Sequence, residues 1–329
     1  MTFAVTPGLV SIVVANYNHA AYLARRMESL IAQTYQNIEI FVIDDCSPDN
    51  SLEILCKYQS NPKVTLVVRE VNGGWIAVSN QGLEMSSGEF VIFANCDDDC
   101  DPRMIERLVD GMRSNPSAGI SYCRSLLIDE NNNVLGDDYS IRERAFRQRC
   151  ASNVLLGKME MGRFLLYSCV IPNLSAALIR RECLAAVGNF SSEYKVCSDW
   201  ELFFRISTDF DVFYISESLN KFREHKTTIR SSTKDRVIYE EIFRLLLVQL
   251  RALKLTLMER ARFRTRVMYL WALHLIPPSF NGLDNFRFHL KSIIQHDPIA
   301  LFYVPIAFAL RFVELLIKLP VRLFKKISE

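Results

Sequence analysis

The sequence predicts an α/β protein, in which a doubly wound, mostly parallel sheet flanked by helices precedes a helical C-terminal region. Over the first 125 residues, short β-branched and aromatic runs alternate with helical patterns, and such alternation implies right-handed crossovers between parallel strands. Polar and acidic residues directly follow three of these runs. Beyond residue 234 the apolar spacing is helical throughout. The expected domains are therefore residues 1–234 and residues 235–329.

Four apolar runs have the composition of strands that are buried on both faces. Val, Ile and Phe dominate them, without the strict alternation of a half-exposed strand. The runs lie at residues 9–15, 38–43, 64–69 and 89–94. The segments between them have helical spacing, and Asp101 followed by Pro102 predicts an N-cap and a first helical residue. The expected helices lie at residues 19–34, 50–59, 75–86 and 102–113, and short strands and helices mix between residues 125 and 230.

The chain's charge is unevenly distributed. Residues 235–329 hold 15 Lys and Arg against 8 Asp and Glu, a net charge of +7, whereas the first 234 residues carry a net charge of −5. A mildly acidic body with a basic, apolar tail favours a catalytic unit held near an anionic surface. Nucleic acid is not an expected partner, because the cations of the tail alternate with Leu, Phe and Ile and form no polar stripe.

The last 32 residues, 298–329, combine an apolar start with a basic end. They are too short and too often interrupted by charge for a transmembrane helix, which needs about 20 apolar residues. A helix lying in the membrane plane, with Lys325 and Lys326 at the phosphate headgroups, fits the composition better. The alternative is a helix that packs on the protein's own body or on a second copy.

The cysteines and the N-terminus predict the compartment. Nine cysteines lie between Cys46 and Cys197 with no CxxC pair, a spacing that fits neither a disulfide scaffold nor a zinc site. We therefore expect reduced thiols in a cytosolic protein. The first residues carry no cationic segment before the apolar ones, so no secretory signal is expected.

Ligands of doubly wound sheets bind beyond the carboxyl ends of the strands. Asp44 and Asp45 follow the second strand, and their carboxylates suit the N3–H of uracil or ribose hydroxyls. Ser47 or Asp49 also explains this turn as a helix cap.

Four acids crowd the seven positions from Asn95 to Asp101, after the fourth strand. A cation relieves their repulsion, and Mg²⁺ or Mn²⁺ takes such oxygen ligands; Asp97 is the preferred ligand. A solvated acidic loop that caps the next helix is the alternative.

Two later segments carry polar groups that could take part in catalysis. Asp199 opens an expected helix over residues 198–208; such an acid usually interacts with the helix dipole, and it can act as a general base only if the fold brings it opposite the metal. Arg223 and His225 share a polar turn, which alone indicates little.

A series of short motifs follows the order found in a known family. They are SIVVANYN at 11–18, VIDDCSPD at 42–49, NGG at 72–74, SNQGL at 79–83, SGE at 87–89, NCDD at 95–98 with a proline at 102, GNF at 188–190, DWEL at 199–202 and RxH at 223–225. In this order they resemble the family 2 glycosyltransferases, which have the GT-A fold. The resemblance extends to about residue 232 and covers none of the last hundred residues.

The resemblance implies inverting transfer of a sugar from a nucleotide sugar, with UDP the expected nucleotide, to a hydroxyl of a glycan or of a lipid-linked oligosaccharide. Mn²⁺ or Mg²⁺ is the implied cofactor, and Asp199 takes the role of catalytic base. The implied metal ligands are Asp97, Asp98 and His225. Arg223 and Trp200 are candidate contacts to the diphosphate or the acceptor, although a core position suits Trp200 equally well. The implied nucleotide-binding residues are Ala15, Tyr17, Asn18, Asp44, Asp45, Asn72, Asn80, Asn95, Cys96 and Asp97.

Three residues depart from the pattern of the family. Cys46 replaces a usual Gly, an exchange that fits only a position with negative φ. Asn95 replaces the first Asp of the DxD motif, which lowers the charge of the site and keeps one oxygen ligand. Ser198 replaces a usual Glu and leaves Asp199 as the only acid of its pair.

Two rival functions are weighed against this one. A sugar-nucleotide pyrophosphorylase would carry a Gly-rich phosphate loop after the first strand, and residues 15–19 contain no glycine. A catalytically silent subunit at the membrane could retain the fold; Asn95 and Ser198 support it, whereas Asp97 and Asp199 oppose it. The setting that the resemblance and the tail imply is peripheral attachment to the cytoplasmic face of a bacterial membrane, in the synthesis of a surface polysaccharide such as O-antigen.

Overall fold

The computed structural model describes the chain except for residues 1–4, 138–151, 172, 226–232, 276–281 and 314–329. Contacts divide it into two compact units, Met1–Thr228 and Ile229–Glu329. Each unit is described by itself. The first contains a ten-stranded mixed sheet with helices, and the second is helical.

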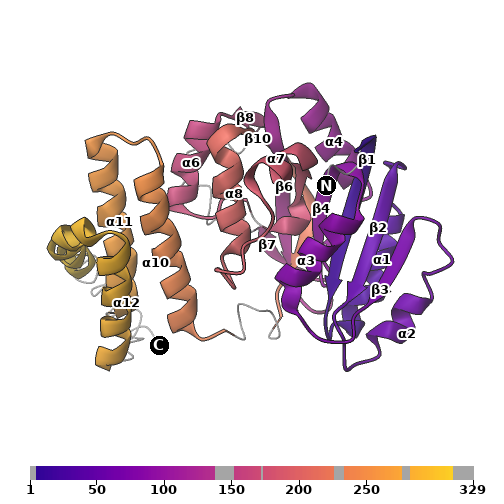
Figure 1. Cartoon of the computed structure of the whole chain (residues 1–329), viewed down its shortest axis with the longest axis horizontal. Coiled ribbons are helices and arrows are strands. Elements are labelled where there is room, and N and C mark those ends of the chain that lie inside the picture. Colours follow the sequence, from indigo (N-terminus) through magenta and orange to yellow (C-terminus); the bar gives the residue numbers. More distant parts are fainter. Residues whose placement is uncertain (1–4, 138–151, 172, 226–232, 276–281, 314–329) are drawn as a thin grey trace, which may run out of the picture. The chain divides into compact units, whose positions relative to one another are not determined.

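Four parallel strands begin the sheet of the first unit. They are β1 (Thr6–Asn16), β2 (Ile38–Asp44), β3 (Val64–Val68) and β4 (Gly88–Asn95), in the spatial order β3-β2-β1-β4. All four apolar runs expected to be strands are confirmed. Their Val, Ile and Phe side chains are buried because helices cover both faces of the sheet (Figure 1).

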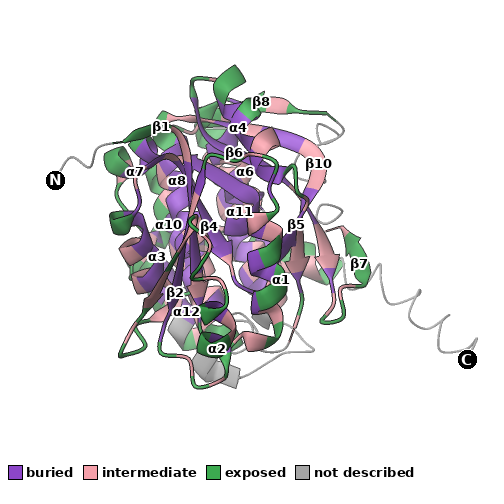
Figure 2. Ribbon diagram, turned by 90° about the vertical axis from the view of Figure 1, so that its right-hand side faces the viewer, coloured by how far each residue is buried: buried purple, intermediate pink, exposed green. Residues whose placement is uncertain are grey.

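The rest of the sheet is mixed. β9 (Ala177–Arg180) runs antiparallel between β4 and β6 (Ala118–Ile128), and β10 (Asp211–Arg223) lies parallel to β6. β5 (Asp99–Cys100) and β8 (Val154–Leu156) pair with β10, and β7 (Val134–Asp137) pairs with β6. β4 and β6 are largely buried (Figure 2).

Helices lie on both faces of the sheet. Val10, Ile12 and Val14 of β1 share one core with apolar side chains of α1 (Ala20–Ile31) and α4 (Met104–Ser114). Val13, which points to the opposite face, lies under Gly82 of α3 (Gly74–Met85). Among the described residues of this unit, the other α-helices are α2 (Ser51–Cys56), α6 (Lys158–Tyr167), α7 (Arg181–Val187) and α8 (Ser198–Asp209). The expected α/β class is therefore confirmed.

Three helix boundaries differ from the expectation by two or more residues. α4 begins at Met104 and not at Pro102, because Asp101 and the two residues after it form a turn in which Asp101 Oδ1 accepts a hydrogen bond from the Arg103 N–H at 2.9 Å. α1 ends at Ile31 and α2 ends at Cys56, each three residues earlier than expected.

The second unit consists of α10 (Asp235–Ala252), α11 (Leu257–Leu275), α12 (Gly282–His296) and the 3₁₀ helix η3 (Pro298–Tyr303), followed by a helix that is described to residue 313. α10 contacts α11 and α12, and Trp271 is 1% exposed in the resulting core. Arg264 pairs with the buried Asp297 at 2.7 Å. None of the helices in the described part of the chain has the length and apolarity required to span a membrane. Lys325 and Lys326, expected at lipid headgroups, fall outside the described residues.

Candidate functional site

The strand order creates a switch point between β1 and β4. From β1 the chain moves outward to β2 and β3, and it then returns to place β4 on the other side of β1. Ligands of open α/β sheets bind at such a point, beyond the carboxyl ends of the strands. Here those ends lead into residues 16–19 and residues 95–99.

Asp97 lies at this edge between two histidines. His225 Nε2 is 2.8 Å from Asp97 Oδ2, and His19 Nε2 is 4.0 Å from the same oxygen. His225 follows β10, and His19 precedes α1. One ligand atom from each residue lies within 4.8 Å of the other two. Two imidazoles and one carboxylate can hold a divalent transition ion, and the Tyr22 ring, 5.2 Å from His225, packs beside them.

The three consecutive aspartates, Asp97, Asp98 and Asp99, differ in their partners and in their pKa values. Burial raises the pKa of Asp97, but the hydrogen bond with His225 and the charges of His19 and His225 outweigh burial and hold that pKa below its ordinary value. Burial, and then the charge of Asp97, raise the pKa of Asp98 to about 7. Asp99 pairs with Arg25 at 2.8 Å and with Lys221 at 3.3 Å.

Asp98 lies outside the group formed by His19, Asp97 and His225, and its expected role as a metal ligand stays a prediction. It is 1% exposed, and its carboxylate accepts hydrogen bonds from the Arg223 N–H at 3.0 Å and from Asn95 Nδ2 at 3.2 Å. Asn95 therefore orients Asp98 through its amide nitrogen. Asn95 is not part of the metal cluster that the described residues form.

Arg223 is buried and bonded within the protein, so its expected contact with the diphosphate or the acceptor would need an exchange of partners and stays a prediction. Its side chain is 1% exposed, and its guanidinium donates to the carbonyl oxygens of Asp97 and Asp129 and to Asn132 Oδ1 at 2.6 to 2.7 Å. The guanidinium carbon lies 4.9 Å from the centre of the Tyr22 ring. Arg223 thus holds the backbone of Asp97 in place through the hydrogen bond to the Asp97 carbonyl oxygen.

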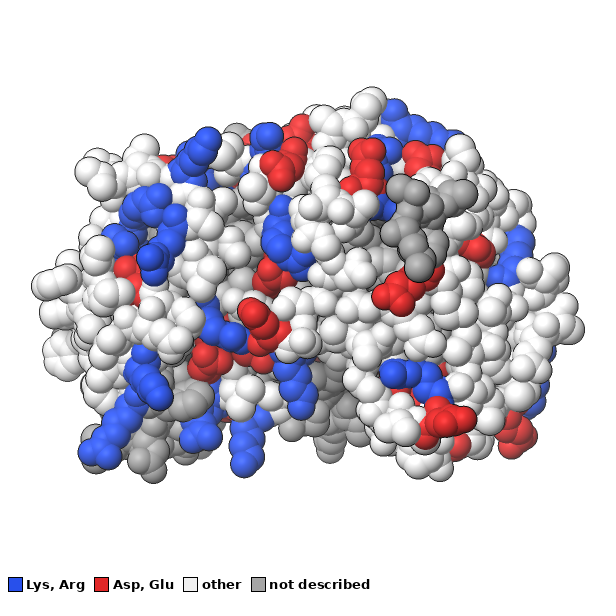
Figure 3. Space-filling model, in the orientation of Figure 1, with Lys and Arg blue, Asp and Glu red and all other residues white. Residues whose placement is uncertain are grey.

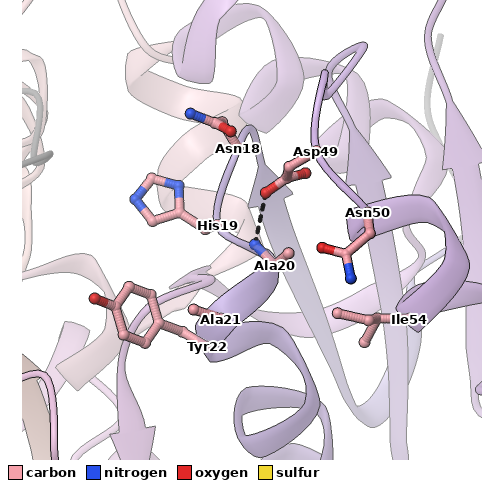
Figure 4. Close-up of a pocket in the computed structure, with 8 residues that line it drawn as sticks. All are labelled: Asn18, His19, Ala20, Ala21, Tyr22, Asp49, Asn50 and Ile54. Carbon is pink, nitrogen blue, oxygen red and sulfur yellow. Dashed lines mark hydrogen bonds between the residues drawn. The ribbon is translucent and has the colours of Figure 1, made fainter.

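A pocket of about 540 Å³ adjoins the cluster. It is lined by residues of the β1–α1 loop and of the start of α2: Asn18, His19, Ala20, Ala21, Tyr22, Asp49, Asn50 and Ile54. In Figure 4, His19 and Tyr22 lie on one side, Asn50 and Ile54 lie on the other, and Asp49 accepts a hydrogen bond from the Ala20 N–H at 2.9 Å. His19 belongs to both the pocket and the metal cluster.

Asp44 and Asp45 are each 2% exposed. Asp44 accepts hydrogen bonds from Asn16 Nδ2 and Ser47 Oγ, each at 2.6 Å. Asp45 pairs with Arg69 at 2.8 Å and accepts from the N–H groups of Gly73 and Gly74 at the N-terminus of α3. Both carboxylates therefore hold the loops beside the pocket, and a base contact by either one would need an exchange of these partners.

Cys46 adopts a φ of +62°. The condition under which Cys fits in place of Gly is therefore not met: the turn after Asp45 places this residue in the left-handed region, and a side chain with a Cβ occupies it at a cost of about 1–2 kcal/mol. Asn18 in the neighbouring loop has a φ of +58°, which Asn tolerates better.

The remaining candidate nucleotide contacts differ in their accessibility. Tyr17 is 45% exposed, and Asn72 is exposed next to the N-terminus of α3. Ala15 is half-buried near the end of β1, whereas Cys96 is 6% exposed and burial raises the pKa of its thiol. Asn80 exchanges two hydrogen bonds of 3.1 Å with the backbone of Phe190, which ties α3 to the segment before α8; its expected nucleotide contact stays a prediction.

Asp199 and Trp200 occupy the first turn of α8. Asp199 is half-buried, and its Oδ1 accepts a hydrogen bond from the Trp200 N–H at 2.7 Å. Trp200 is 8% exposed, and its Nε1 donates to the Leu165 carbonyl at 3.1 Å. Trp200 therefore takes a position in the core. The role of Asp199 as a general base stays a prediction.

Sequence reasoning missed His19. The residue follows Tyr17 and Asn18 at the end of the first strand, so the rule that ligands meet the carboxyl ends of strands could have found it. A lone imidazole gives no indication of its partners, and Asp97 lies 78 positions further along the chain.

The model of the family described as "Glycosyl transferase family 2" matches residues 11–187, more than half of the chain. The glycosyltransferase GlyG of Streptococcus pneumoniae is 32% identical over 146 residues, 43% of this chain and 48% of its own length. An uncharacterized glycosyltransferase of Rickettsia typhi is 30% identical over 218 residues, 66% of this chain and 64% of its own length. The chain thus spans about half to two thirds of these relatives.

Solved structures share the fold. Residues 1–349 of TarS from S. aureus, in complex with UDP-GlcNAc, align with a TM-score of 0.67 and 18% identity over 90% of this chain and 84% of that one. A crystal structure of the same TarS fragment with UDP aligns with a TM-score of 0.64.

Proposed function

This chain belongs to glycosyl transferase family 2 and has its GT-A fold, and on that premise we propose that it transfers a sugar from a UDP-sugar, with inversion, to a hydroxyl of a glycan or of a lipid-linked oligosaccharide. The observation that carries this proposal is the Asp97–His225 pair at the switch point of the sheet, beside a polar pocket. The complexes of TarS with UDP and with UDP-GlcNAc support the choice of nucleotide.

The donor site would use the loops already described. Asn18 and Asn50 offer amide groups in the pocket, and Tyr17 offers an exposed ring at its edge. Asp97 and His225 would hold Mn²⁺ or Mg²⁺; when bound, this ion neutralises the negative charge of the leaving nucleoside diphosphate. Arg223 would keep Asp97 in place through its bond to the Asp97 carbonyl.

Asp199 would act as the general base. It would accept the proton of the acceptor hydroxyl while that oxygen forms a bond to the anomeric carbon and the bond from that carbon to the diphosphate oxygen breaks. Attack from the face opposite the leaving group inverts the configuration. The negative charge of the leaving group then remains on the diphosphate.

Calorimetric titration with UDP, GDP and dTDP, each with Mn²⁺ and with EDTA, tests the donor site. We expect UDP to bind more tightly than GDP or dTDP, and to lose affinity in EDTA. Asp97→Asn should weaken UDP binding in Mn²⁺ at least tenfold while the affinity in EDTA stays unchanged. Absence of binding to all three nucleotides would contradict the proposal.

Asp199→Asn tests the chemistry separately. We expect transfer to fall by about 10²–10⁴-fold, while UDP affinity stays within twofold of the unsubstituted protein. Glu193→Gln, an exposed acid in the segment before α8, is the matched control and should keep full activity. Metal-dependent nucleotide binding without turnover in the unsubstituted protein would favour the catalytically silent subunit.

The setting proposed for this activity is the cytoplasmic face of a bacterial membrane, in the synthesis of a surface polysaccharide. The segment after α12 supports peripheral contact, because Ile299, Phe302, Ile306 and Phe312 are 50% to 80% exposed there. Large apolar side chains so exposed favour the interface of a lipid bilayer.

A further inference from the structure

We propose that His19 is the third protein ligand of the divalent metal and binds it through Nε2, so that the protein holds the ion with two imidazoles and one carboxylate. This inference rests on the proposed metal site at Asp97 and His225. It adds a ligand from a third segment of the chain, the β1–α1 loop, and it connects the ion to the wall of the pocket.

The hydrogen bond at the other ring nitrogen prepares His19 for this role. His19 Nδ1 lies 2.6 Å from the Tyr17 carbonyl oxygen. A carbonyl only accepts hydrogen bonds, so Nδ1 carries a proton; in the neutral form of the ring, which metal binding requires, Nε2 carries the lone pair. Such a bond to a backbone carbonyl is the usual means by which proteins orient a metal-bound imidazole.

His19 Nε2 is shielded from solvent and has no hydrogen-bond partner among the described residues. A buried acceptor without a partner destabilises the folded protein. Asp97 Oδ2, 4.0 Å away, is an acceptor and cannot satisfy the lone pair of a neutral ring. A cation between the two atoms would satisfy both.

The distances between the three ligand atoms are close to those around a single metal ion, and small side-chain shifts would bring all three atoms to it. Bonds of about 2.0–2.2 Å place two ligands of one ion about 3–4 Å apart. His225 Nε2 and His19 Nε2 lie 2.8 Å and 4.0 Å from Asp97 Oδ2. The two imidazoles meet edge to face, with ring centroids 5.3 Å apart and an interplanar angle of 75°, so the rings do not stack against each other.

The donor set has a consequence for the choice of metal. Mg²⁺ prefers oxygen ligands throughout, whereas imidazole suits transition ions. Two nitrogen ligands therefore favour Mn²⁺ or Co²⁺ over Mg²⁺. Because Asn18, Ala20 and Tyr22 line the pocket together with His19, a bound ion would also fix the loop that receives the nucleotide.

Binding of Mn²⁺ to the full chain without nucleotide tests the proposal, measured by calorimetry and by the EPR signal of free Mn²⁺. We expect His19→Ala and His225→Ala each to weaken Mn²⁺ binding at least tenfold. His296→Ala is the matched control, because it removes an imidazole that lies outside the cluster; its affinity should stay within twofold. Circular dichroism checks that each variant is folded.

A second readout does not depend on affinity. Pulsed EPR of bound Mn²⁺ detects the nitrogens of coordinated imidazoles, and we expect two rings in the unsubstituted protein and one in His19→Gln, which preserves the size of the side chain.

The outcomes separate this inference from the proposed function. If His19→Ala binds Mn²⁺ like the unsubstituted protein while His225→Ala loses it, His19 is no ligand and the donor site stands. One coordinated imidazole in the unsubstituted protein would overturn the inference in the same way. If no variant binds Mn²⁺ but UDP still binds, the inference fails and so does the metal part of the donor site.

Discussion

Single residues near the pocket show where sequence reasoning succeeded and where it failed. Asp97 and His225, proposed from motif order, lie in contact although 128 positions separate them. Within the run of three aspartates the sequence could not decide which side chain faces the ligand side. Their directions follow from distant partners, namely His225 for Asp97, Arg223 for Asp98, and Arg25 with Lys221 for Asp99.

Cys46 offers a test of backbone strain. Cys46→Gly should stabilise the protein by roughly 0.5–1 kcal/mol, because the relief of positive φ is partly offset by the larger entropy of unfolded glycine. Urea denaturation measures the difference. Cys46→Ala also removes the thiol but keeps Cβ, so it should give no such gain. Equal stabilisation by both variants would show that the thiol, and not the φ angle, is unfavourable.

Asp49 should make stability depend on pH. Burial raises the pKa of Asp49, but hydrogen bonds donated by Ser51 and by the Ala20 N–H outweigh burial, and the pKa lies below its ordinary value. The carboxylate therefore stabilises the fold above pH ~4, and this contribution is lost as the pH falls through the lowered pKa.

The variant Asp49→Asn measures that contribution. We expect it to lower the free energy of unfolding by roughly 0.5–1 kcal/mol at pH 7, a modest value because solvent screens a half-exposed carboxylate. The difference from the unsubstituted protein should shrink as the pH approaches 3. A difference that grows in acid would contradict the assignment. Asp110→Asn, on the exposed side of α4, is the control and should show no such pH dependence.

At the scale of elements, the first half of the sheet could be predicted and the second half could not. β1 to β4 are each a run of apolar residues separated by a helix, so local composition determines them. β9 is four residues long and lies between strands from distant parts of the chain. Its place depends on the open edges of β4 and β6, which local sequence does not reveal.

The contact between α3 and β1 requires a glycine. A Cβ added at Gly82 would lie 2.3 Å from Val13 Cγ1. Gly82→Ala should therefore lower the free energy of unfolding by about 1–3 kcal/mol. Glu84→Ala on the exposed side of α3 is the control, with an expected change within about 0.5 kcal/mol. An unchanged stability of Gly82→Ala would contradict this close approach.

At the scale of the whole molecule, charge was a weaker guide than motif order. Acidic and basic side chains are interspersed over the face shown in Figure 3, so the net charges of the two halves do not translate into separate patches there. The exposed apolar residues after α12 are the stronger indication of a membrane contact, and composition alone did not distinguish them from buried ones.

The membrane contact can be tested without removing the segment. We expect Phe302→Glu combined with Phe312→Glu to reduce cosedimentation with vesicles that contain anionic lipid at least fivefold, because both rings are exposed. Val134→Glu on β7 of the first unit, at a 61% exposed position, is the control. Undiminished cosedimentation of the double variant would favour a segment that packs against protein.

β9 also affects the order in which the chain folds. Both edges of this short strand are paired, one with β4 and the other with β6. A growing chain therefore holds β4 with an unpaired edge until the ribosome has added residue 180. β6 pairs first with β7, then with β9, and gains β10 last. Open apolar edges recruit other chains. We therefore expect a chain cut after β6 to aggregate more readily than the full chain, which light scattering measures.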